Sequence, residues 1–211
     1  RESKKPIDDE IQNNIMQRLH AVLDMVDCVI ISDYNKGLLS EELTQFIINY
    51  AKSKSKLVLC DPKGQDYRKY SGATLLTPNK KEAQLATGIN ITDQSTLIHA
   101  GMALKEICNL THSIITLSED GIGVFADNAM ERIPTKAKEV YDVTGAGDTV
   151  IAALGFALSS GCDILKACEF ANTAAAVVVG KVGSAVATHS EIMTYLHTQS
   201  TNLRQHIASK I

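Results

Sequence analysis

The segment DVTGAGDTV (142–150) combines a glycine-rich turn with a nearby carboxylate. Apolar residues at helical spacing begin immediately after the turn, so Gly145, Ala146 and Gly147 are predicted to open a helix whose first N–H groups have no partner within it. Such groups lie at the positive end of the helix dipole and bind anions such as phosphate. Asp148 lies beside the expected anion, where a carboxylate can accept the proton of an attacking hydroxyl group. The segment is therefore typical of phosphoryl transfer.

A purely structural role for this segment stays open. Glycine-rich loops are common, and an acid in the first turn of a helix can simply offset the helix dipole, which contributes under about 1 kcal/mol. Two other phosphate-binding motifs are excluded. Val150 stands where G-x-G-x-x-G requires its last glycine, and Gly180-Lys181 is followed by Val182 instead of the serine or threonine of a P-loop.

Predicted strands and helices alternate along most of the chain. The strands are predicted at 27–33, 56–61, 73–77, 112–117, 121–125 and 130–134. The helices are predicted at 8–25, 40–53, 78–87, 94–108, 146–160 and 163–179, with a short closing helix after Thr188–Glu191. This alternation predicts an α/β fold with a mostly parallel central sheet and helices on both faces. Thr77 is predicted to cap the 78–87 helix, with Pro78 as its first residue.

Other helix ends and one turn are also predicted. Gly88 is expected to end the 78–87 helix, and Asp93 and Asp163 are expected to cap the helices that follow them. Thr188 and Glu191 match a capping box for the closing helix. Residues 127–129 (DNA) are expected to form the turn between the strands at 121–125 and 130–134.

Polar residues follow the first two predicted strands, at the sheet edge where ligands of α/β proteins bind. Asp33 ends the first strand and Lys36 follows it, while Lys63 comes after Asp61-Pro62 at the end of the second. Lysine binds phosphate as a point charge, so both lysines are candidates for contact with a phosphate group. Solvated lysines in surface turns are the alternative.

Composition limits the possible classes of function. The chain has 211 residues, 45% of them hydrophobic, and a net charge of -3, which gives no electrostatic signature for nucleic acid or an anionic membrane. One domain is expected at 1–196, followed by a polar tail or linker at 197–211. No apolar run approaches the roughly 20 residues that span a bilayer. Five scattered cysteines without a C-x-x-C pair indicate reduced thiols, so a soluble cytoplasmic protein is predicted.

Several motifs resemble, in the expected order, those of the ribokinase-like (carbohydrate kinase) family. DVTGAGDTV at 142–150 is similar to the highly specific C-terminal signature of the family, and NKKE at 79–82 is similar to its N-x-x-E motif. TLSEDG (116–121) resembles the nucleotide-side turn, and FANTAAAVVVGKVGSA (170–185) resembles the segment that flanks adenine. The resemblance covers nearly the whole chain. It implies a ribokinase-like fold and an ATP-dependent sugar kinase that uses Mg²⁺.

The resemblance also implies roles for single residues. Asp148 would be the catalytic base that activates the sugar hydroxyl for attack on the γ-phosphate of ATP, and residues 145–147 would form the anion hole. Asn79 and Glu82 would organise Mg²⁺ through water, in keeping with the preference of Mg²⁺ for one or two carboxylates plus substrate phosphates. The implied nucleotide-binding residues are Asn79, Lys80, Lys81, Glu82, Ser118, Gly121 and Asn172.

Most of these roles have a structural alternative. The N-x-x-E residues also fit ordinary helix-start chemistry, and Ser118 and Gly121 fit a plain turn. Asn172 is either an adenosine contact or a solvent-facing amide. Asp142 would fix the anion-hole loop or a nearby cation, or it would only cap its own loop.

Within the family, three segments look most like the kinases that act on heptose 7-phosphate; they are 32–40, 61–70 and 75–82. This likeness implies phosphorylation of the anomeric hydroxyl group of D-glycero-D-manno-heptose 7-phosphate to the 1,7-bisphosphate, in ADP-heptose and lipopolysaccharide biosynthesis. Asp33, Lys36 and Lys63 would then contact the substrate. The alternatives are another ribokinase-like sugar or nucleoside kinase, and a non-catalytic nucleotide-binding module.

The N-terminal strands, glycine-pair motif and small sugar-binding lid of the family precede the point at which this chain begins. We therefore expect the C-terminal portion of a kinase domain, which binds Mg·ATP but has little kinase activity alone. No H-x-G-H nucleotidyltransferase motif occurs. The resemblance implies a homodimer for the full-length protein and is compatible with fusion to an adenylyltransferase domain.

Overall fold

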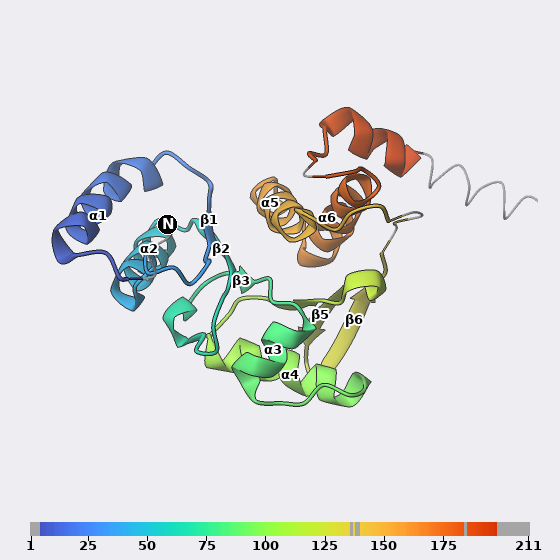
Figure 1. Cartoon of the computed structure of the whole chain (residues 1–211), viewed down its shortest axis with the longest axis horizontal. Coiled ribbons are helices and arrows are strands. Elements are labelled where there is room, and N and C mark those ends of the chain that lie inside the picture. The colour runs from blue at the N-terminus through green and yellow to red at the C-terminus, as the bar shows by residue number, and fades with distance from the viewer. Residues whose placement is uncertain (1–4, 136, 138–139, 184, 198–211) are drawn as a thin grey trace, which may run out of the picture.

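The computed structural model describes residues 5–135, 137, 140–183 and 185–197, and its elements follow the predicted order (Figure 1). The α-helices are α1 (Asp9–Leu23), α2 (Glu41–Ser53), α3 (Lys80–Thr87), α4 (Gln94–Ile107), α5 (Ala146–Ser159) and α6 (Ile164–Val179), and residues 189–197 are also helical. The strands are β1 (Cys28–Ser32), β2 (Leu57–Asp61), β3 (Leu75–Leu76), β4 (Ser113–Thr116), β5 (Ile122–Ala126) and β6 (Ala129–Ile133). The short 3-10 helices η1 (Arg68–Tyr70) and η2 (Ser118–Asp120) follow β2 and β4.

The first four strands run in the same direction. β1, β2 and β3 form a parallel sheet, in which Leu59 of β2 pairs with Leu75 of β3. β4 lies alongside the end of β3, because the N–H of Thr116 donates to the carbonyl of Pro78 at 2.9 Å in a parallel bridge. β4, β5 and β6 form an antiparallel sheet. The predicted α/β fold is confirmed, with its parallel part in β1–β4.

A tight turn reverses the chain between β5 and β6. Asp127 and Asn128 occupy its centre with φ angles of 51° and 57°. Two successive residues with positive φ are characteristic of the type I′ turn that hairpins favour, and Asp and Asn adopt this conformation more readily than most residues. The turn predicted between these strands is confirmed, and it explains why this part of the sheet is antiparallel.

The strands separate two apolar cores. Side chains alternate along β2, so Val58 and Cys60 belong to one core and Leu59 belongs to the other. The first core includes Leu43 of α2 and residues of α3 and α4, while the second includes Leu154 of α5 and residues of α6. Figure 1 shows these two groups of helices on opposite sides of the strands. The predicted helices on both faces are therefore confirmed.

One helix starts later than the sequence predicts. The N-cap of α3 is Asn79, whose side chain accepts the N–H of Glu82 at 3.0 Å while the Glu82 carboxylate accepts the N–H of Asn79 at 2.9 Å. The prediction of Thr77 as the cap and Pro78 as the first helical residue is wrong. Both residues are buried, and the Pro78 carbonyl bonds to β4. The reciprocal capping box satisfies two N–H groups at once, which favours the later start.

The other predicted helix ends are confirmed. Asp93 caps α4 and Asp163 caps α6, and each accepts the N–H of the residue three positions later. Gly88 ends α3 with a φ of 70°. Thr188 and Glu191 form the predicted capping box, with the Thr188 N–H donating to the Glu191 carboxylate at 2.9 Å.

Residues 5–135, 137, 140–183 and 185–197 include no helix long and apolar enough to cross a membrane. The cysteines are unpaired, and Cys60, Cys108 and Cys168 are buried. Residues 198–211 of the predicted tail lie outside the described residues, so the boundary after residue 196 stays a prediction.

Candidate active site

The N-terminus of α5 is open to a ligand. Gly145 caps the helix in the left-handed conformation, with a φ of 79° and no side-chain hydrogen bond. A Cβ atom added at Gly145 or Gly147 would meet no atom within 4 Å, so there is room beside the backbone. Within the part of the chain that the structure describes, no group accepts the N–H of Gly147. The N–H of Ala146 does have an acceptor, the Val143 carbonyl at 3.1 Å, so its prediction as an unpaired group of the anion hole is wrong.

Asp148 presents a free carboxylate at this helix end. It is exposed, and no hydrogen bond or ion pair to its side chain is formed by any residue that the structure describes. Asp148, Thr144 and Gly145 line one end of a cavity of about 630 Å³. The remaining wall is mostly apolar and includes Phe156 of α5 and Phe170 of α6. The geometry leaves Asp148 available to a hydroxyl group that enters the cavity.

Asp142 holds the loop before α5 in place. Its carboxylate accepts the N–H of Thr144 at 2.9 Å and the N–H of Gly183 at 3.2 Å. The hydrogen bonds from Thr144, assisted by that from Gly183, lower the pKa of Asp142. Because Gly183 lies beyond the end of α6, Asp142 ties the glycine-rich turn to the loop after α6. This placement supports the loop-fixing role among the alternatives predicted for Asp142.

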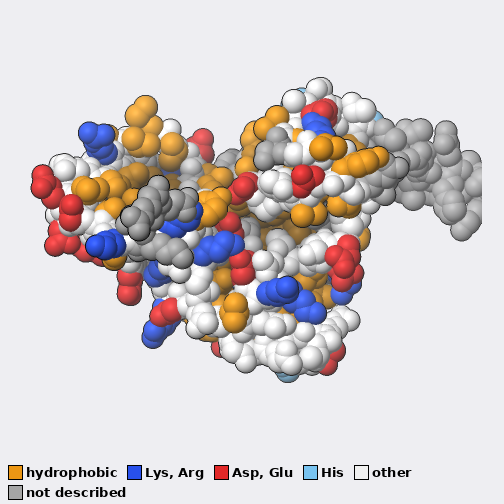
Figure 2. Space-filling model, in the orientation of Figure 1, with side chains coloured by type: hydrophobic (Ala, Val, Ile, Leu, Met, Phe, Trp, Pro, Cys, Tyr) orange, Lys and Arg blue, Asp and Glu red, His pale blue; other side chains and the backbone are white. Residues whose placement is uncertain are grey.

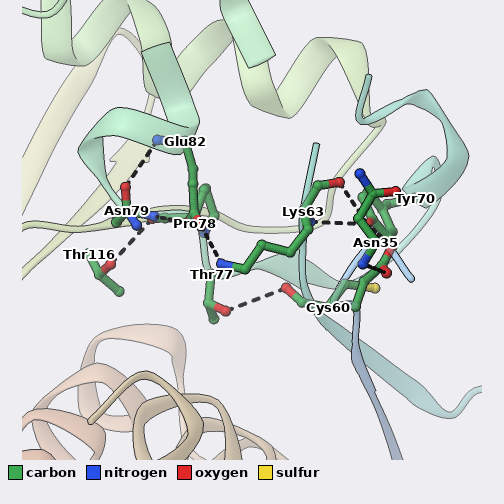
Figure 3. A network of polar contacts seen from close by, with 10 residues as sticks. Asn35, Cys60, Lys63, Tyr70, Thr77, Pro78, Asn79, Glu82 and Thr116 are labelled. Carbon is green, nitrogen blue, oxygen red and sulfur yellow. Dashed lines mark hydrogen bonds and ion pairs between the residues drawn. The ribbon is translucent and has the colours of Figure 1, made fainter. Parts of the chain in front are cut away.

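The ends of β2 and β3 bring Lys63 and Glu82 together (Figure 3). The Lys63 ammonium forms an ion pair with Oε1 of Glu82, while Oε2 of Glu82 accepts the N–H of Asn79. The backbone N–H of Lys63 donates to the Tyr70 hydroxyl at 3.2 Å. The sequence motifs predict that Lys63 contacts the substrate and that Glu82 helps to hold the metal. In the structure the two side chains form an ion pair with each other.

Asp61 is a candidate site residue that the sequence analysis did not single out. It ends β2, and burial, opposed by the charge of Lys63 and reinforced by the carboxylates of Glu82 and Asp148, raises the pKa of Asp61. The position of a carboxylate at the end of a buried strand was the available signal. Acidic and basic side chains gather between α5 and α3 in the face shown in Figure 2. Asp61 therefore links the α5 end of the site to the Lys63–Glu82 pair.

Asp33 is buried and fully engaged by the protein. Its side chain is 3% exposed, and its carboxylate accepts hydrogen bonds from the Lys69 ammonium at 2.5 Å, the Tyr70 hydroxyl at 2.6 Å and the N–H of Asn35 at 2.7 Å. Burial acts to raise the pKa of Asp33, but these hydrogen bonds more than offset it and hold the pKa below its ordinary value. The placement favours a structural role over the predicted substrate contact, because the carboxylate is almost completely buried and already accepts three hydrogen bonds.

The remaining predicted lysines lie on the surface. Lys36 is exposed on the turn after β1, with its ammonium 5.9 Å from the centre of the Tyr34 ring. Lys80 and Lys81 are exposed in the first turn of α3, next to Asn79. Their contacts with a phosphate stay predictions.

Two of the residues predicted to lie on the nucleotide side, Gly121 and Asn172, lie against the end of β6. Ser118 is exposed in η2 with a φ of 54°, and Gly121 follows it with a φ of 92°. The Asn172 side chain is 5% exposed and donates to the carbonyls of Ile133 at 2.8 Å and Pro134 at 3.3 Å. Asn172 is therefore not the solvent-facing amide that the sequence left open; it ties α6 to the strand that also contacts Gly121.

Replacing Gly121 by alanine should destabilise the fold strongly. An added Cβ atom would lie 2.0 Å from the Ile133 carbonyl oxygen, and the positive φ strains any side chain. Gly88→Ala is the matched control, because Gly88 also has a positive φ but its added Cβ would meet no atom within 4 Å. We expect Gly121→Ala to lower the free energy of unfolding by about 2 kcal/mol more than Gly88→Ala, measured by urea unfolding. Equal losses would contradict a steric requirement for glycine in this turn.

The acidic side chains at the strand ends suit a divalent cation that is shared with a phosphate. Among the described residues, no group of three or more His, Cys, Asp or Glu side chains could hold a metal ion by itself. However, Asp61, Glu82 and Asp148 outnumber Lys63, and the charges of Glu82 and Asp148 add to the effect of burial in raising the pKa of Asp61. Mg²⁺ is commonly held by one or two carboxylates together with substrate phosphates, so the residues present fit such an ion.

Comparison with family models places nearly the whole chain in one family. A model described as pfkB family carbohydrate kinase matches residues 7–191, which include every element from α1 to α6. The chain belongs to the pfkB family of carbohydrate kinases. The resemblance inferred from the sequence motifs is thereby confirmed, and the α5 end of the site belongs to a pfkB fold.

Curated pfkB relatives are much longer than this chain. It is 76% identical over 211 residues to the bifunctional protein HldE of Helicobacter hepaticus, covering 100% of this chain and 44% of that protein. It is 57% identical over 197 residues to the bifunctional protein HldE of Wolinella succinogenes, covering 93% of this chain and 41% of that protein. The chain therefore spans less than half the length of these relatives.

Solved structures of two kinases share the fold of this chain. Phosphofructokinase-2 from Escherichia coli, solved with potassium, matches with a TM-score of 0.75 at 15% identity, over 87% of this chain and 62% of that chain. Ribokinase from Arabidopsis thaliana, solved with ribose and ATP, matches with a TM-score of 0.73 at 18% identity, over 91% of this chain and 60% of that chain. The predicted ribokinase-like fold is confirmed.

Proposed function

We propose that the protein transfers the γ-phosphate of ATP to the anomeric hydroxyl group of D-glycero-D-manno-heptose 7-phosphate. The observation that carries this proposal is the arrangement at the N-terminus of α5. There the carboxylate of Asp148, which has no partner among the described residues, lies beside the open backbone of Gly145 and Gly147. An anion-binding helix end next to a free base is what phosphoryl transfer to an alcohol requires. Membership of the pfkB family supports the same class of reaction.

In this mechanism Asp148 accepts the proton of the sugar hydroxyl as the hydroxyl oxygen attacks the γ-phosphate. The bond between the γ-phosphorus and the oxygen that bridges the β- and γ-phosphates breaks, and ADP leaves. The N–H of Gly147 and the positive end of the α5 dipole stabilise the negative charge on the transferred group. Lys63 can reach a phosphate oxygen, and Glu82 and Asn79 would hold Mg²⁺ through water. The bound Mg²⁺ would neutralise the charge of the nucleotide phosphates. Ser118 and Gly121 contact the nucleotide side in this proposal.

The choice of sugar rests on the segments that flank the site and on the relatives. Residues 32–40, 61–70 and 75–82 resemble heptose 7-phosphate kinases, and the chain is 76% identical to a bifunctional protein HldE. The greater length of that relative supports fusion of the kinase part to an adenylyltransferase. A cytoplasmic homodimer that acts in ADP-heptose and lipopolysaccharide biosynthesis is part of the same proposal.

The proposal is tested by measuring ADP release from the intact protein with a panel of acceptors. Heptose 7-phosphate should give a kcat/KM at least about a hundredfold above those of ribose, fructose and adenosine, because a site that holds a polar group of its substrate rejects acceptors that lack that group. Preference for one of the other acceptors would identify another ribokinase-like kinase. Nucleotide binding without turnover of any acceptor would favour a non-catalytic module.

A further inference from the structure

Lys63 is the cation placed among the carboxylates at the strand ends. It pairs with Glu82, and burial, which acts to lower its pKa, is outweighed by Glu82 and Asp61, so the pKa of Lys63 is raised. Its side chain is 37% exposed, whereas that of Glu82 is 18% exposed. The ammonium is therefore held in its charged form, and more than a third of the Lys63 side chain is exposed to solvent.

The backbone of Lys63 is fixed although its side chain has room to turn. The Lys63 N–H donates to the Tyr70 hydroxyl, which in turn donates to the buried carboxylate of Asp33. Four methylene groups separate the ammonium from this anchor. An ammonium binds as a compact point charge with little directional demand, so it can exchange one anionic partner for another. The ammonium of Lys63 can therefore change partners without any movement of the Lys63 backbone.

One carboxylate oxygen of Glu82 takes part in the capping box of α3, and the other does not. Its Oε2 accepts the Asn79 N–H in the capping box of α3, while its Oε1 pairs with Lys63 and with no other residue that the structure describes. Removal of the ammonium would leave Oε1 unpaired without breaking the start of the helix. Asp61 and Asp148 already act on this region as further negative charges.

We propose that Lys63 is an exchangeable counter-ion of Glu82. Without nucleotide it neutralises Glu82; when Mg·ATP enters, its ammonium moves to a phosphate oxygen and frees Oε1 of Glu82 to face the metal. Lys63 thus couples metal binding to phosphate binding, so that the metal binds well only when it arrives with the nucleotide. This inference rests on the proposed function, because it requires a nucleotide phosphate at the strand ends.

The test measures binding of Mn²⁺ to the intact protein by electron paramagnetic resonance, without and with a non-hydrolysable ATP analogue. Lys63→Gln should bind free Mn²⁺ about fivefold more tightly than the unmodified protein, because Glu82 loses its competing partner. The same variant should bind the ATP analogue at least about fivefold more weakly than the unmodified protein does. Lys63→Arg keeps the charge and should resemble the unmodified protein in free Mn²⁺ binding.

Two further variants separate this role from a general effect of charge. Lys54→Gln removes a lysine that pairs with Asp24 at 3.3 Å, before the start of β2 and away from the carboxyl ends of the strands. It should change neither the binding of free Mn²⁺ nor the binding of the ATP analogue. Glu82→Gln combined with Lys63→Gln should abolish the gain in Mn²⁺ affinity. Unchanged or weaker Mn²⁺ binding by Lys63→Gln would overturn the exchange. These measurements involve no sugar and no turnover. A negative result would therefore overturn the counter-ion exchange without contradicting the proposed kinase reaction.

Discussion

Replacing Asp148 by asparagine should lower the kcat of the intact protein about a thousandfold with its best acceptor sugar. The amide has nearly the shape of the carboxylate but cannot accept the hydroxyl proton. Binding of the ATP analogue should be retained, because the N-terminus of α5 is formed by backbone groups that the substitution leaves in place. Steady-state kinetics and calorimetric titration of the analogue would measure the two effects.

Asp127→Asn is the matched control for this substitution. Asp127 is exposed in the β5–β6 hairpin with a φ of 51°, a conformation that asparagine adopts equally well. It should leave kcat and nucleotide binding unchanged. If Asp148→Asn kept its kcat, Asp148 would be a structural acid that offsets the helix dipole, and the proposed base would have to be another group.

Replacing Asp33 by asparagine should destabilise the fold by about 3 to 5 kcal/mol, the usual cost of removing one partner from a buried ion pair. The substitution leaves the Lys69 ammonium largely buried beside a neutral amide, with its side chain 18% exposed. It also weakens the hydrogen bond from Tyr70, which anchors the Lys63 loop. Thermal unfolding of the intact protein should show a fall of roughly 10 °C in the midpoint of the transition that includes this domain.

The pH dependence of this effect follows from the lowered pKa of Asp33. A carboxylate with a folded-state pKa below its unfolded value stabilises the fold fully above the unfolded pKa, and this stabilisation is lost as the pH falls through the folded-state pKa. The difference in stability between the unmodified protein and Asp33→Asn should be constant from about pH 6 to pH 8 and should shrink below about pH 4. Asp66→Asn, which removes an exposed ion pair with Arg68, should change the midpoint little. A midpoint for Asp33→Asn equal to that of the control would contradict the structural role of Asp33.

Local sequence determined the elements and their ends. Helix caps at Asp93 and Asp163, the left-handed end at Gly88 and the reversal at Asp127 and Asn128 each depend on residues a few positions apart. For the same reason the opening of α5 was predictable, since glycines and an acid within five positions set its chemistry. The motifs also sufficed to indicate the pfkB family, which the comparison confirmed.

Only the tertiary structure decided which polar side chains remain available to a ligand. Asp33 and Asp61 look alike in the sequence, since each ends an apolar strand. In the structure Lys69 and Tyr70 donate hydrogen bonds to the carboxylate of Asp33. Asp61 instead experiences the charges of Lys63, Glu82 and Asp148. These partners come from distant positions in the chain, and their distances depend on how the helices pack against the sheet. The start of α3 shows the same limit, because pairing of Pro78 with β4 excluded the helix start that the local pattern favoured. The sequence by itself thus determined the fold, the family and the glycine-rich turn that we propose to bind phosphate, whereas long-range packing decided the charge balance of the site.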